Sequence, residues 1–205
     1  MNDGRDHDRS AAAERPARSS PPPHRVLVGI SGASGAAYGL FALRRLAARA
    51  DVETHLVVTD AARRTIAAEL DVPLSRLREL ADVVHDVRDI GAPPASGGFA
   101  MAGMIVAPCS VHTLSAIAVS QADNLLLRAA DVTLKERRPL VLMLRETPLH
   151  LGHIRAMEAV TAMGAVVFPP VPAFYTRPRD IDDIIGQSVD RALSLLRLPP
   201  APSAP

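Results

Sequence analysis

A run of five apolar residues, Leu140–Leu144, determines the expected fold class more firmly than any other segment of this chain. It follows a proline and precedes the polar sequence RETP, which begins at Arg145. A short strand that is apolar at every position is typical of the middle of a parallel sheet, where helices cover both faces. Ligands of such sheets bind just beyond the carboxyl ends of the strands. Arg145 and Glu146 are therefore candidates for a binding site.

Similar apolar runs alternate with helical patterns along the earlier part of the chain. Residues 26–30 and 53–59 predict strands, and a helical pattern follows each, reaching about residue 48 after the first and covering residues 61–70 after the second. Asp60 stands where the cap of the second helix is expected. A βαβα order favours a parallel sheet with right-handed crossovers. The sequence thus predicts an α/β fold with a central parallel sheet.

The remaining segments continue this alternation. Further strands are expected at residues 83–87, 104–107 and 166–168, and further helices at residues 74–80, 111–119, 124–136, 149–163 and 181–196. Ser110 and Asp180 precede two of these helices as candidate caps. Residues 90–102 are rich in glycine and proline and predict a loop, and loops over a sheet edge often carry sites. The segment PPVPAFYTRPRD, which contains Phe174 and Tyr175, predicts a rigid, non-helical connection.

Length and composition indicate one domain. The chain has 205 residues, of which 48% are hydrophobic, enough for a sizeable core. We expect the domain to cover residues 25–197, between a disordered N-terminal tail at residues 1–24 and a frayed, proline-rich end at residues 198–205. The N-terminal tail lacks the apolar stretch of a signal peptide. Basic and acidic residues balance in the domain, so we expect neither a nucleic acid partner nor a membrane surface. No apolar run is long enough for insertion into a membrane.

The cysteine and histidine content argues against disulfide and metal chemistry. Cys109 is the only cysteine, which rules out an internal disulfide and fits a cytoplasmic location. We interpret Cys109 as a small packed thiol, because no base that would activate it is evident nearby. His150 and His153 have a spacing that a metal could use. No further cluster of Cys, His or Asp supports one, so we interpret them as surface histidines and expect no metal.

Two features are compatible with phosphate binding and also with a purely structural role. The turn SGASG, from Ser31 to Gly35, follows the first strand and opens a helix, and its small residues would let backbone amides approach a phosphate. A plain tight turn is an equally good interpretation. Lys135 is the only lysine beside twenty-two arginines, and lysine offers a compact, movable charge for a phosphate. The alternative for Lys135 is a solvated helix end within the sequence KERR.

Six segments of the chain have a characteristic order and spacing. They read VGISGASGAAYG, APCSxxTLxAIA, ADNLLLRAADVTLKERRPLVL, RETPL, MGAVVFPPVPAFY and RPRDIDDII. Over residues 25–197 they resemble the flavin prenyltransferases of the UbiX type. This resemblance implies a Rossmann-like (flavodoxin-like) three-layer flavoprotein fold, usually assembled as a homododecamer with its sites between subunits. It also implies metal-independent transfer of a dimethylallyl group from dimethylallyl phosphate to reduced FMN, giving prenylated FMN for a UbiD-type decarboxylase in ubiquinone synthesis or aromatic-acid breakdown.

The resemblance also implies roles for individual residues. Those matched to FMN contacts are Gly32, Ala33, Ser34, Thr59, Ser110, Thr113 and Arg128. Those matched to the prenyl phosphate site are Lys135, Arg145, Tyr175 and Arg191. The catalytic candidates are Glu146, which matches the proposed acid/base, Glu69, which matches a family glutamate at the same site, and Ser34, which matches a serine close to the reactive ring. Cationic and phenolic donors suit a leaving phosphate, because they stabilise the charge that develops as the carbon–oxygen bond breaks.

The chain departs from the family pattern in two places, and two other functions remain open. It lacks the tryptophan that the family carries near the C-terminus, and the loop Ser96-Gly97-Gly98-Phe99 lacks a second Ser or Thr expected beside the phosphate. One alternative is a flavin-dependent cysteine decarboxylase, a sister group with a PxMN segment where this chain reads APCS. The other is an FMN carrier without chemistry. The sequence leaves open whether the donor is the monophosphate or the diphosphate.

Overall fold

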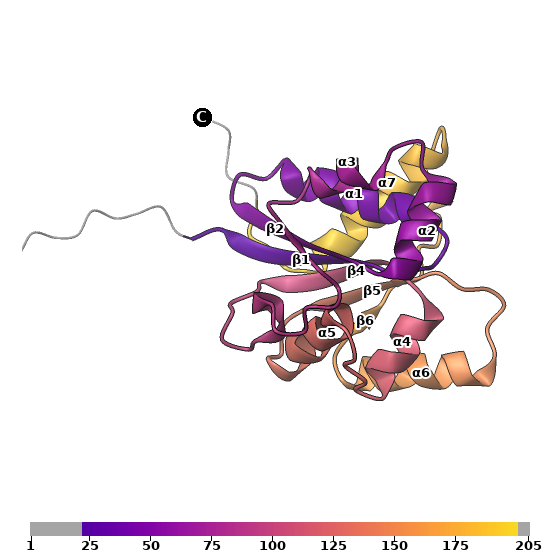
Figure 1. The fold of residues 1–205 in the computed structure, drawn as a ribbon. Helices are drawn as coiled ribbons and strands as arrows, with labels where there is room; N and C mark the ends of the chain where they lie inside the picture. Colours follow the sequence, from indigo (N-terminus) through magenta and orange to yellow (C-terminus); the bar gives the residue numbers. More distant parts are fainter. Residues whose placement is uncertain (1–21, 201–205) are drawn as a thin grey trace, which may run out of the picture.

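The computed structural model describes residues 22–200, which form a six-stranded parallel sheet between two layers of helices (Figure 1). The strands are β1 (His24–Ile30), β2 (Val52–Val58), β3 (Val83–His85), β4 (Gly103–Cys109), β5 (Leu140–Leu144) and β6 (Val166–Val167). Their order across the sheet is β3-β2-β1-β4-β5-β6, and every neighbouring pair is parallel. This is the order of a doubly wound Rossmann sheet. The predicted fold class is confirmed.

Each face of the sheet has its own group of helices (Figure 1). One face carries α1 (Ala36–Ala47), α2 (Asp60–Glu69), α3 (Leu74–Arg78) and α7 (Ile181–Ser194), and the other carries α4 (Val111–Ala118), α5 (Leu125–Lys135) and α6 (Leu151–Ala162). Short 3-10 turns lie at Pro93–Ala95 and Phe174–Thr176. The second turn corrects the prediction of a non-helical connection. The prolines at 169, 170 and 172 all precede it, so the amides of Thr176 and Arg177 are free to close the turn on Ala173 and Phe174.

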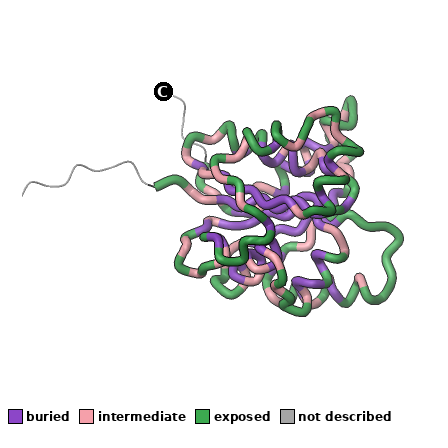
Figure 2. Tube along the Cα trace, in the orientation of Figure 1, coloured by how far each residue is buried: buried purple, intermediate pink, exposed green. Residues whose placement is uncertain are grey.

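The strands are buried because their side chains enter a core on each face. In β1, Val26, Val28 and Ile30 pack toward α1 and α7, whereas Leu27 packs into the other core, with α5. All of β5 is buried, as predicted for a central strand, and Figure 2 shows the buried strands as a purple band through the middle of the molecule. The polar ends of these strands therefore open on a single edge of the sheet.

The sequence predicted Asp60 as the cap of α2, but the structure shows that Thr59 is the cap. The Oγ1 of Thr59 accepts a hydrogen bond from the amide of Ala62 at 3.1 Å. Asp60 is the first helical residue, and its carboxylate forms an ion pair with Arg88 at 3.0 Å. Threonine and aspartate both cap helices, and β2 ends at Val58, one residue earlier than predicted. That shift moves the cap back by one position.

The two predicted tails lie mostly outside the described residues, which begin at 22 and end at 200. Near the C-terminal end, Leu198 packs against the core and the carbonyl of Pro199 accepts a hydrogen bond from Arg49 at 2.8 Å. Within the part of the chain that the structure describes, none of the helices has the length and apolar character needed to cross a membrane.

Candidate functional site

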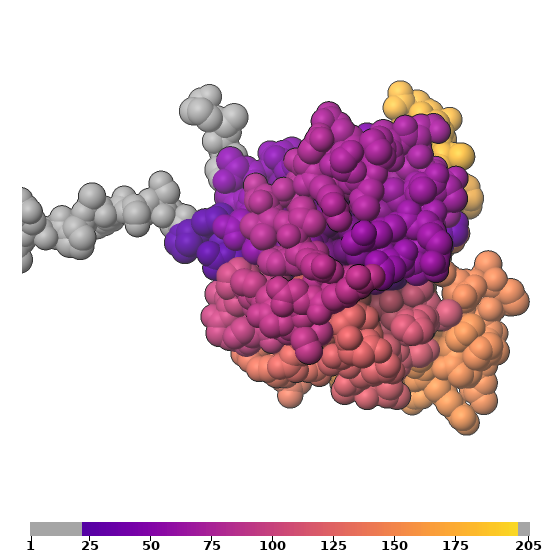
Figure 3. All heavy atoms as spheres, viewed as in Figure 1, coloured from indigo at the N-terminus to yellow at the C-terminus, as the bar shows by residue number. Residues whose placement is uncertain are grey.

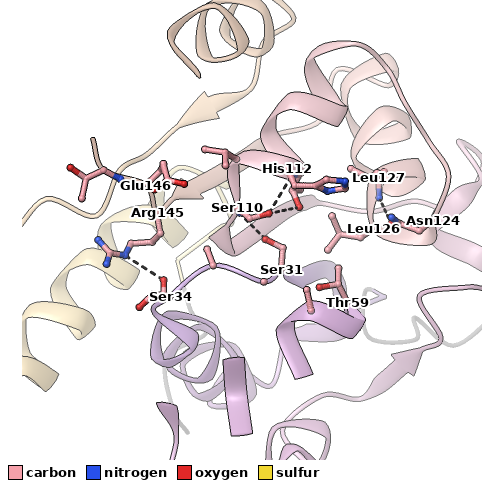
Figure 4. A pocket seen from close by; sticks show the side chains of 16 residues that line it. Ser31, Ser34, Thr59, Ser110, His112, Asn124, Leu126, Leu127, Arg145 and Glu146 are labelled. Carbon is pink, nitrogen blue, oxygen red and sulfur yellow. Dashed lines mark hydrogen bonds between the residues drawn. The ribbon is translucent and has the colours of Figure 1, made fainter. Parts of the chain in front are cut away.

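The candidate site lies where the strand order reverses, at the carboxyl ends of β1, β4 and β5. The chain leaves β1 toward β2 on one side and β4 toward β5 on the other, which opens a crevice between the ends of β1 and β4. A pocket of about 570 Å³ lies there, and Figure 3 shows the surface hollowed at this edge. The pocket brings together eight of the predicted site residues, which are Gly32, Ala33, Ser34, Thr59, Ser110, Thr113, Arg145 and Glu146 (Figure 4).

Ser31 joins the ends of β1 and β4 beneath the pocket. Its side chain is 1% exposed. The hydroxyl donates to the carbonyl of Pro108 at 2.9 Å and accepts from the amide of Ser110 at 2.8 Å (Figure 4). The amide of Ser31 donates to the same carbonyl at 3.2 Å. These bonds hold the turn after β1 against the start of α4.

The turn after β1 requires glycine at two positions. A Cβ atom on Gly32 would lie 2.4 Å from the Cβ of Ala61 at the start of α2, closer than two carbon atoms can approach. Gly35 has φ of 103°, a left-handed conformation that side chains rarely adopt. The wall of the pocket is therefore main chain together with the small side chains of Ala33 and Ser34. A flat ligand can approach the backbone closely here.

Glu69, the last residue of α2, lies beside the pocket and caps α1. Its Oε2 accepts hydrogen bonds from the amides of Gly35 at 2.8 Å and Ala36 at 2.9 Å. Loss of hydration raises the pKa of this carboxyl, but the amides of Ala36 and Gly35, the hydroxyl of Ser34 and the charge of Arg145 outweigh it. The pKa of Glu69 is therefore held below its usual value.

Replacing Glu69 with glutamine is expected to remove a stability contribution that depends on pH. Because the folded-state pKa is lowered, the charged carboxylate stabilises the fold above the ordinary carboxyl pKa, and this contribution is lost as the pH falls through the folded-state value. Near neutral pH we expect Glu69→Gln to lower the free energy of unfolding by about 0.3–1 kcal/mol, the size of a carboxylate effect at a helix N-terminus. Urea unfolding from neutral to acid pH measures it.

The control for this measurement is Glu158→Gln, on the exposed side of α6, which should unfold like the unchanged protein at every pH. The difference between Glu69→Gln and the unchanged protein should disappear in acid, where both side chains are neutral. A difference that stays the same at neutral and acid pH would show that the charge of Glu69 contributes nothing.

The start of α4 leaves amides free beside the pocket. Ser110 caps this helix as predicted, since its Oγ accepts from the amide of Thr113 at 3.2 Å. Within residues 22–200 we find no hydrogen-bond partner for the amides of Val111 and His112, which line the pocket. Free amides at the positive end of a helix form a favourable position for an anion.

Arg145 and Glu146 follow β5 at the rim of the pocket, as predicted. The Nε of Arg145 donates to the carbonyl of Ser34 at 3.4 Å, and its amide donates to the carbonyl of Cys109 at 3.0 Å (Figure 4). The carboxylate of Glu146 accepts from the amide of Thr147 at 3.0 Å. Both side chains are exposed, and neither forms an ion pair with any residue between 22 and 200. Both are available to a ligand.

Cys109 lies beneath the site and is a packed thiol, as predicted. Burial raises its pKa to about 12, so the thiol stays protonated near neutral pH. His150 is exposed and His153 half-buried, with ring centroids 3.6 Å apart, and His150 caps α6 by accepting from the amide of Gly152 at 3.0 Å. Among the described residues, no group of three or more His, Cys, Asp or Glu side chains could hold a metal ion.

Four other predicted site residues lie outside the pocket, namely Arg128, Lys135, Tyr175 and Arg191. Arg128 and Lys135, both on α5, form ion pairs with acidic neighbours. Lys135 also lines a second cavity, of about 530 Å³, formed by α4, α5 and α6. Tyr175 is 89% exposed, and Arg191 lies on α7, on the opposite face of the sheet from α5. One copy of the chain does not bring these four side chains to the pocket.

Comparison with known proteins decides the family. A family model described as Flavoprotein matches residues 14–192. The flavin prenyltransferase UbiX of Thauera aromatica is 62% identical over 169 residues, which cover 82% of this chain and 87% of that protein. This chain belongs to the UbiX family of flavin prenyltransferases.

Solved UbiX structures resemble this UbiX-family chain in fold as well as in sequence. A UbiX protein solved in complex with FMN and dimethylallyl pyrophosphate has a TM-score of 0.81 at 52% identity, covering 86% of this chain and 93% of that one. A dodecameric FMN-dependent UbiX-like decarboxylase from Escherichia coli O157:H7 has a TM-score of 0.83 at 43% identity, covering 88% of this chain and 97% of that one.

Sequence reasoning missed several pocket residues of this UbiX-family chain. The pocket is also lined by Ser31, Ala61, Val111, His112, Asn124, Leu126, Leu127 and Thr147. Ser31 opens the SGASG turn, so its position in that motif was the available signal. Leu126 and Leu127 belong to the buried side of α5, and they form an apolar wall of the pocket as well. Nothing in their periodicity distinguishes a core position from a pocket position.

Proposed function

We propose that this chain transfers a dimethylallyl group from dimethylallyl phosphate to reduced FMN and so makes prenylated FMN. In this reaction the carbon–oxygen bond of the donor breaks, phosphate leaves, and the five-carbon unit is bonded to the flavin. One observation carries the proposal. A single pocket joins a glycine-containing turn and free helix amides to an apolar wall and a rim formed by Arg145 and Glu146. The first two features suit a flavin phosphate and ring, and the last two suit a prenyl phosphate.

The residues of the pocket fit FMN. Its volume of about 570 Å³ is in the range of sites for small molecules and cofactors. Glu69 already occupies the first amides of α1, so the free amides at the start of α4, beside Ser110 and Thr113, are the position we propose for the FMN phosphate. The turn at Gly32, with Thr59 across from it, would hold the flavin ring. When bound, FMN supplies the reduced ring that receives the prenyl group.

We propose that the prenyl phosphate is bound by residues from more than one copy of the chain. A leaving phosphate needs cationic and hydroxyl donors in a partly desolvated site. Arg145 is at the pocket, whereas Lys135, Tyr175 and Arg191 lie on the surface away from it. Neighbouring copies in a homo-oligomer would bring these donors to the pocket, with Arg128 beside the flavin at the same contact.

The exposed apolar surface supports assembly into such an oligomer. Val171, Phe174 and Ile181 lie close together in the chain around Tyr175, and each is more than 70% exposed. Exposed apolar side chains that gather in one patch are typical of a contact with another protein, and we propose that these three side chains contribute to such a patch. The assembly that we propose is a dodecamer, the state described for the UbiX-like decarboxylase from Escherichia coli O157:H7.

We propose three catalytic roles around the pocket. Glu146 is the acid/base, because its carboxyl is exposed at the rim with no ion pair to any described residue. Ser34 contacts the reactive side of the flavin from the turn after β1. Glu69 acts beside it by fixing the amides of Gly35 and Ala36, and its charge is retained at neutral pH.

The product would serve as the cofactor of a UbiD-type decarboxylase, in ubiquinone synthesis or in aromatic-acid decarboxylation. We place the reaction in the cytoplasm, where reduced flavin is available and where a chain with one buried cysteine needs no oxidising environment. Arginine, lysine and tyrosine donors can stabilise the leaving phosphate without a metal ion.

The test is anaerobic incubation of the purified chain with reduced FMN and dimethylallyl phosphate, followed by mass spectrometry of the extracted flavin. We expect a flavin heavier by one five-carbon prenyl unit. A parallel incubation with dimethylallyl diphosphate decides which donor is used. FMN that stays bound and unmodified with both donors would contradict the proposal and favour an FMN carrier, and release of carbon dioxide from a peptidyl cysteine would favour a cysteine decarboxylase.

A further inference from the structure

Arg138 lies just beyond the end of α5 and holds the loop that precedes β4. Its Nη1 donates to the carbonyl of Phe99 at 2.9 Å, and its Nη2 donates to the carbonyl of Gly97 at 2.8 Å. The guanidinium group is planar, so two bonds from one group fix both the distance between these carbonyls and their direction. The loop at residues 97–99 is therefore attached to the end of α5.

The backbone of Arg138 is itself fixed by the way α5 ends. Arg137 has φ of 57°, and its amide donates to the carbonyl of Leu134 at 3.0 Å. The amide of Arg138 donates to the carbonyl of Thr133 at 2.9 Å. These two bonds make up a Schellman motif, which closes the helix and sets the direction in which the next side chain leaves it. The guanidinium of Arg138 is thus directed from a rigid base.

The same helix end carries Lys135, and the loop packs directly against it. The ammonium of Lys135 forms an ion pair with Glu136. A Cβ atom on Gly97 would lie 2.7 Å from the Nζ of Lys135 and 2.2 Å from the Oε1 of Glu136, so a side chain there would displace the ends of this pair. The main chain at Gly97 therefore borders the ammonium on one side.

The far end of the loop has a separate anchor. The ring of Phe99 lies under the guanidinium of Arg25, at 4.7 Å from the centroid, and edge-on to His55, with centroids 5.4 Å apart. Gly98 has no comparable packing, since the nearest atom to a Cβ there would be the Oγ of Ser96 at 3.8 Å. The amide of Phe99 also donates to the carbonyl of Ser96 at 3.2 Å, which closes a turn around Gly97 and Gly98. Arg138 supplies the side-chain bonds that attach this turn to the end of α5.

We infer that Arg138 is a positioning residue for Lys135, which it confines by holding Gly97 against the ammonium. The inference rests on the proposed function for the role of Lys135 at the prenyl phosphate. A cation held in one place binds an anion without first losing its own conformational freedom, so it binds more tightly than a mobile one. Loss of Arg138 releases the loop and enlarges the space open to the ammonium.

The test begins with Arg138→Gln and Arg138→Lys in the full chain. For Arg138→Gln we expect the KM for dimethylallyl phosphate to rise about tenfold with FMN affinity unchanged, the effect of losing roughly one well-made hydrogen bond in the site. Arg138→Lys keeps the charge but can reach only one carbonyl, so it should recover part of the loss. Gly97→Ala should raise the same KM without altering Arg138, because its methyl group would displace the Lys135–Glu136 pair.

The double variant Lys135→Ala with Arg138→Gln separates positioning from general stability. If Arg138 acts through Lys135, the double variant should be no slower than Lys135→Ala alone, and an additive loss would overturn the inference. Arg78→Gln is the control, because the side chain of Arg78 on α3 is exposed and bonds to no other residue in 22–200. It should behave like the unchanged chain.

A second measurement keeps the inference testable if the chain does not prenylate FMN at all. If the chain without substitutions is inactive, the proposed function is contradicted. The contacts that Arg138 makes with the loop can then still be tested without an activity measurement. Hydrogen exchange of the amides at residues 97–99 should then be faster in Arg138→Gln than in the unchanged chain or in Arg78→Gln. Equal exchange in all three proteins would overturn the inference, as would an unchanged KM in an active Arg138→Gln protein.

Discussion

Replacing Lys135 with alanine is expected to reduce prenyl transfer by about 10²–10³-fold, the usual cost of removing one donor that stabilises developing charge. In the proposed reaction the phosphate gains negative charge as it leaves, and the only lysine of the chain supplies a compact positive charge for it. FMN affinity should stay nearly unchanged, because Lys135 lies outside the pocket that holds all the predicted flavin contacts except Arg128. The loss should therefore appear in the transfer step and in donor binding.

Single-turnover mass spectrometry of the flavin, with fluorescence titration of FMN, measures both quantities. Arg137→Gln is the matched control, since it removes a cation two residues away on the same helix end and should retain near-normal transfer. Normal transfer by Lys135→Ala would show that the lysine is not part of the prenyl phosphate site. Equal losses in Lys135→Ala and Arg137→Gln would indicate a general effect of charge in place of a specific contact.

The strands and most of the helices follow from local patterns, because local chemistry determines them. Leu140–Leu144 is observed with the predicted bounds, since an all-apolar run between a proline and polar residues has one way to be buried. Asp180 caps α7 as predicted, because its side chain accepts from the amide of Asp183. The cap of α2 was wrong by one residue, because Thr59 and Asp60 are adjacent and chemically able to do the same thing.

The pocket was predictable to the extent that it is made from strand ends. Arg145 and Ser34 follow apolar runs, and parallel topology brings such positions to one edge of the sheet. The role of Glu69 as a cap of α1 was not predictable, because its partners are 34 and 33 residues away in the chain. The resemblance assigned Lys135 and Tyr175 to the site, but one copy of the chain does not bring them to the pocket, so their role there stays a prediction.

Replacing Ser31 with alanine is expected to destabilise the fold by about 1–3 kcal/mol, because the amide of Ser110 loses its hydrogen-bond acceptor. The carbonyl of Pro108 loses the hydroxyl as a donor but keeps the amide of Ser31 at 3.2 Å, whereas no such second partner is present for the amide of Ser110 among the described residues. In the folded chain bulk water scarcely reaches Ser31, which is 1% exposed. For a chain of this size, a loss of this magnitude lowers the melting temperature by roughly 2–12 °C.

The same variant should weaken FMN binding. The hydroxyl of Ser31 accepts the hydrogen bond from the amide of Ser110, and this bond holds the start of α4 against the turn after β1. Thermal unfolding with and without FMN measures both effects, and Ser115→Ala, on the exposed side of α4, is the control that should change neither. An unchanged melting temperature for Ser31→Ala would mean that the two strand ends hold their positions without this hydroxyl. Lower stability with unchanged FMN affinity would instead confine the role of Ser31 to the fold, and the free amides of α4 would then be positioned by the Ser110 cap alone.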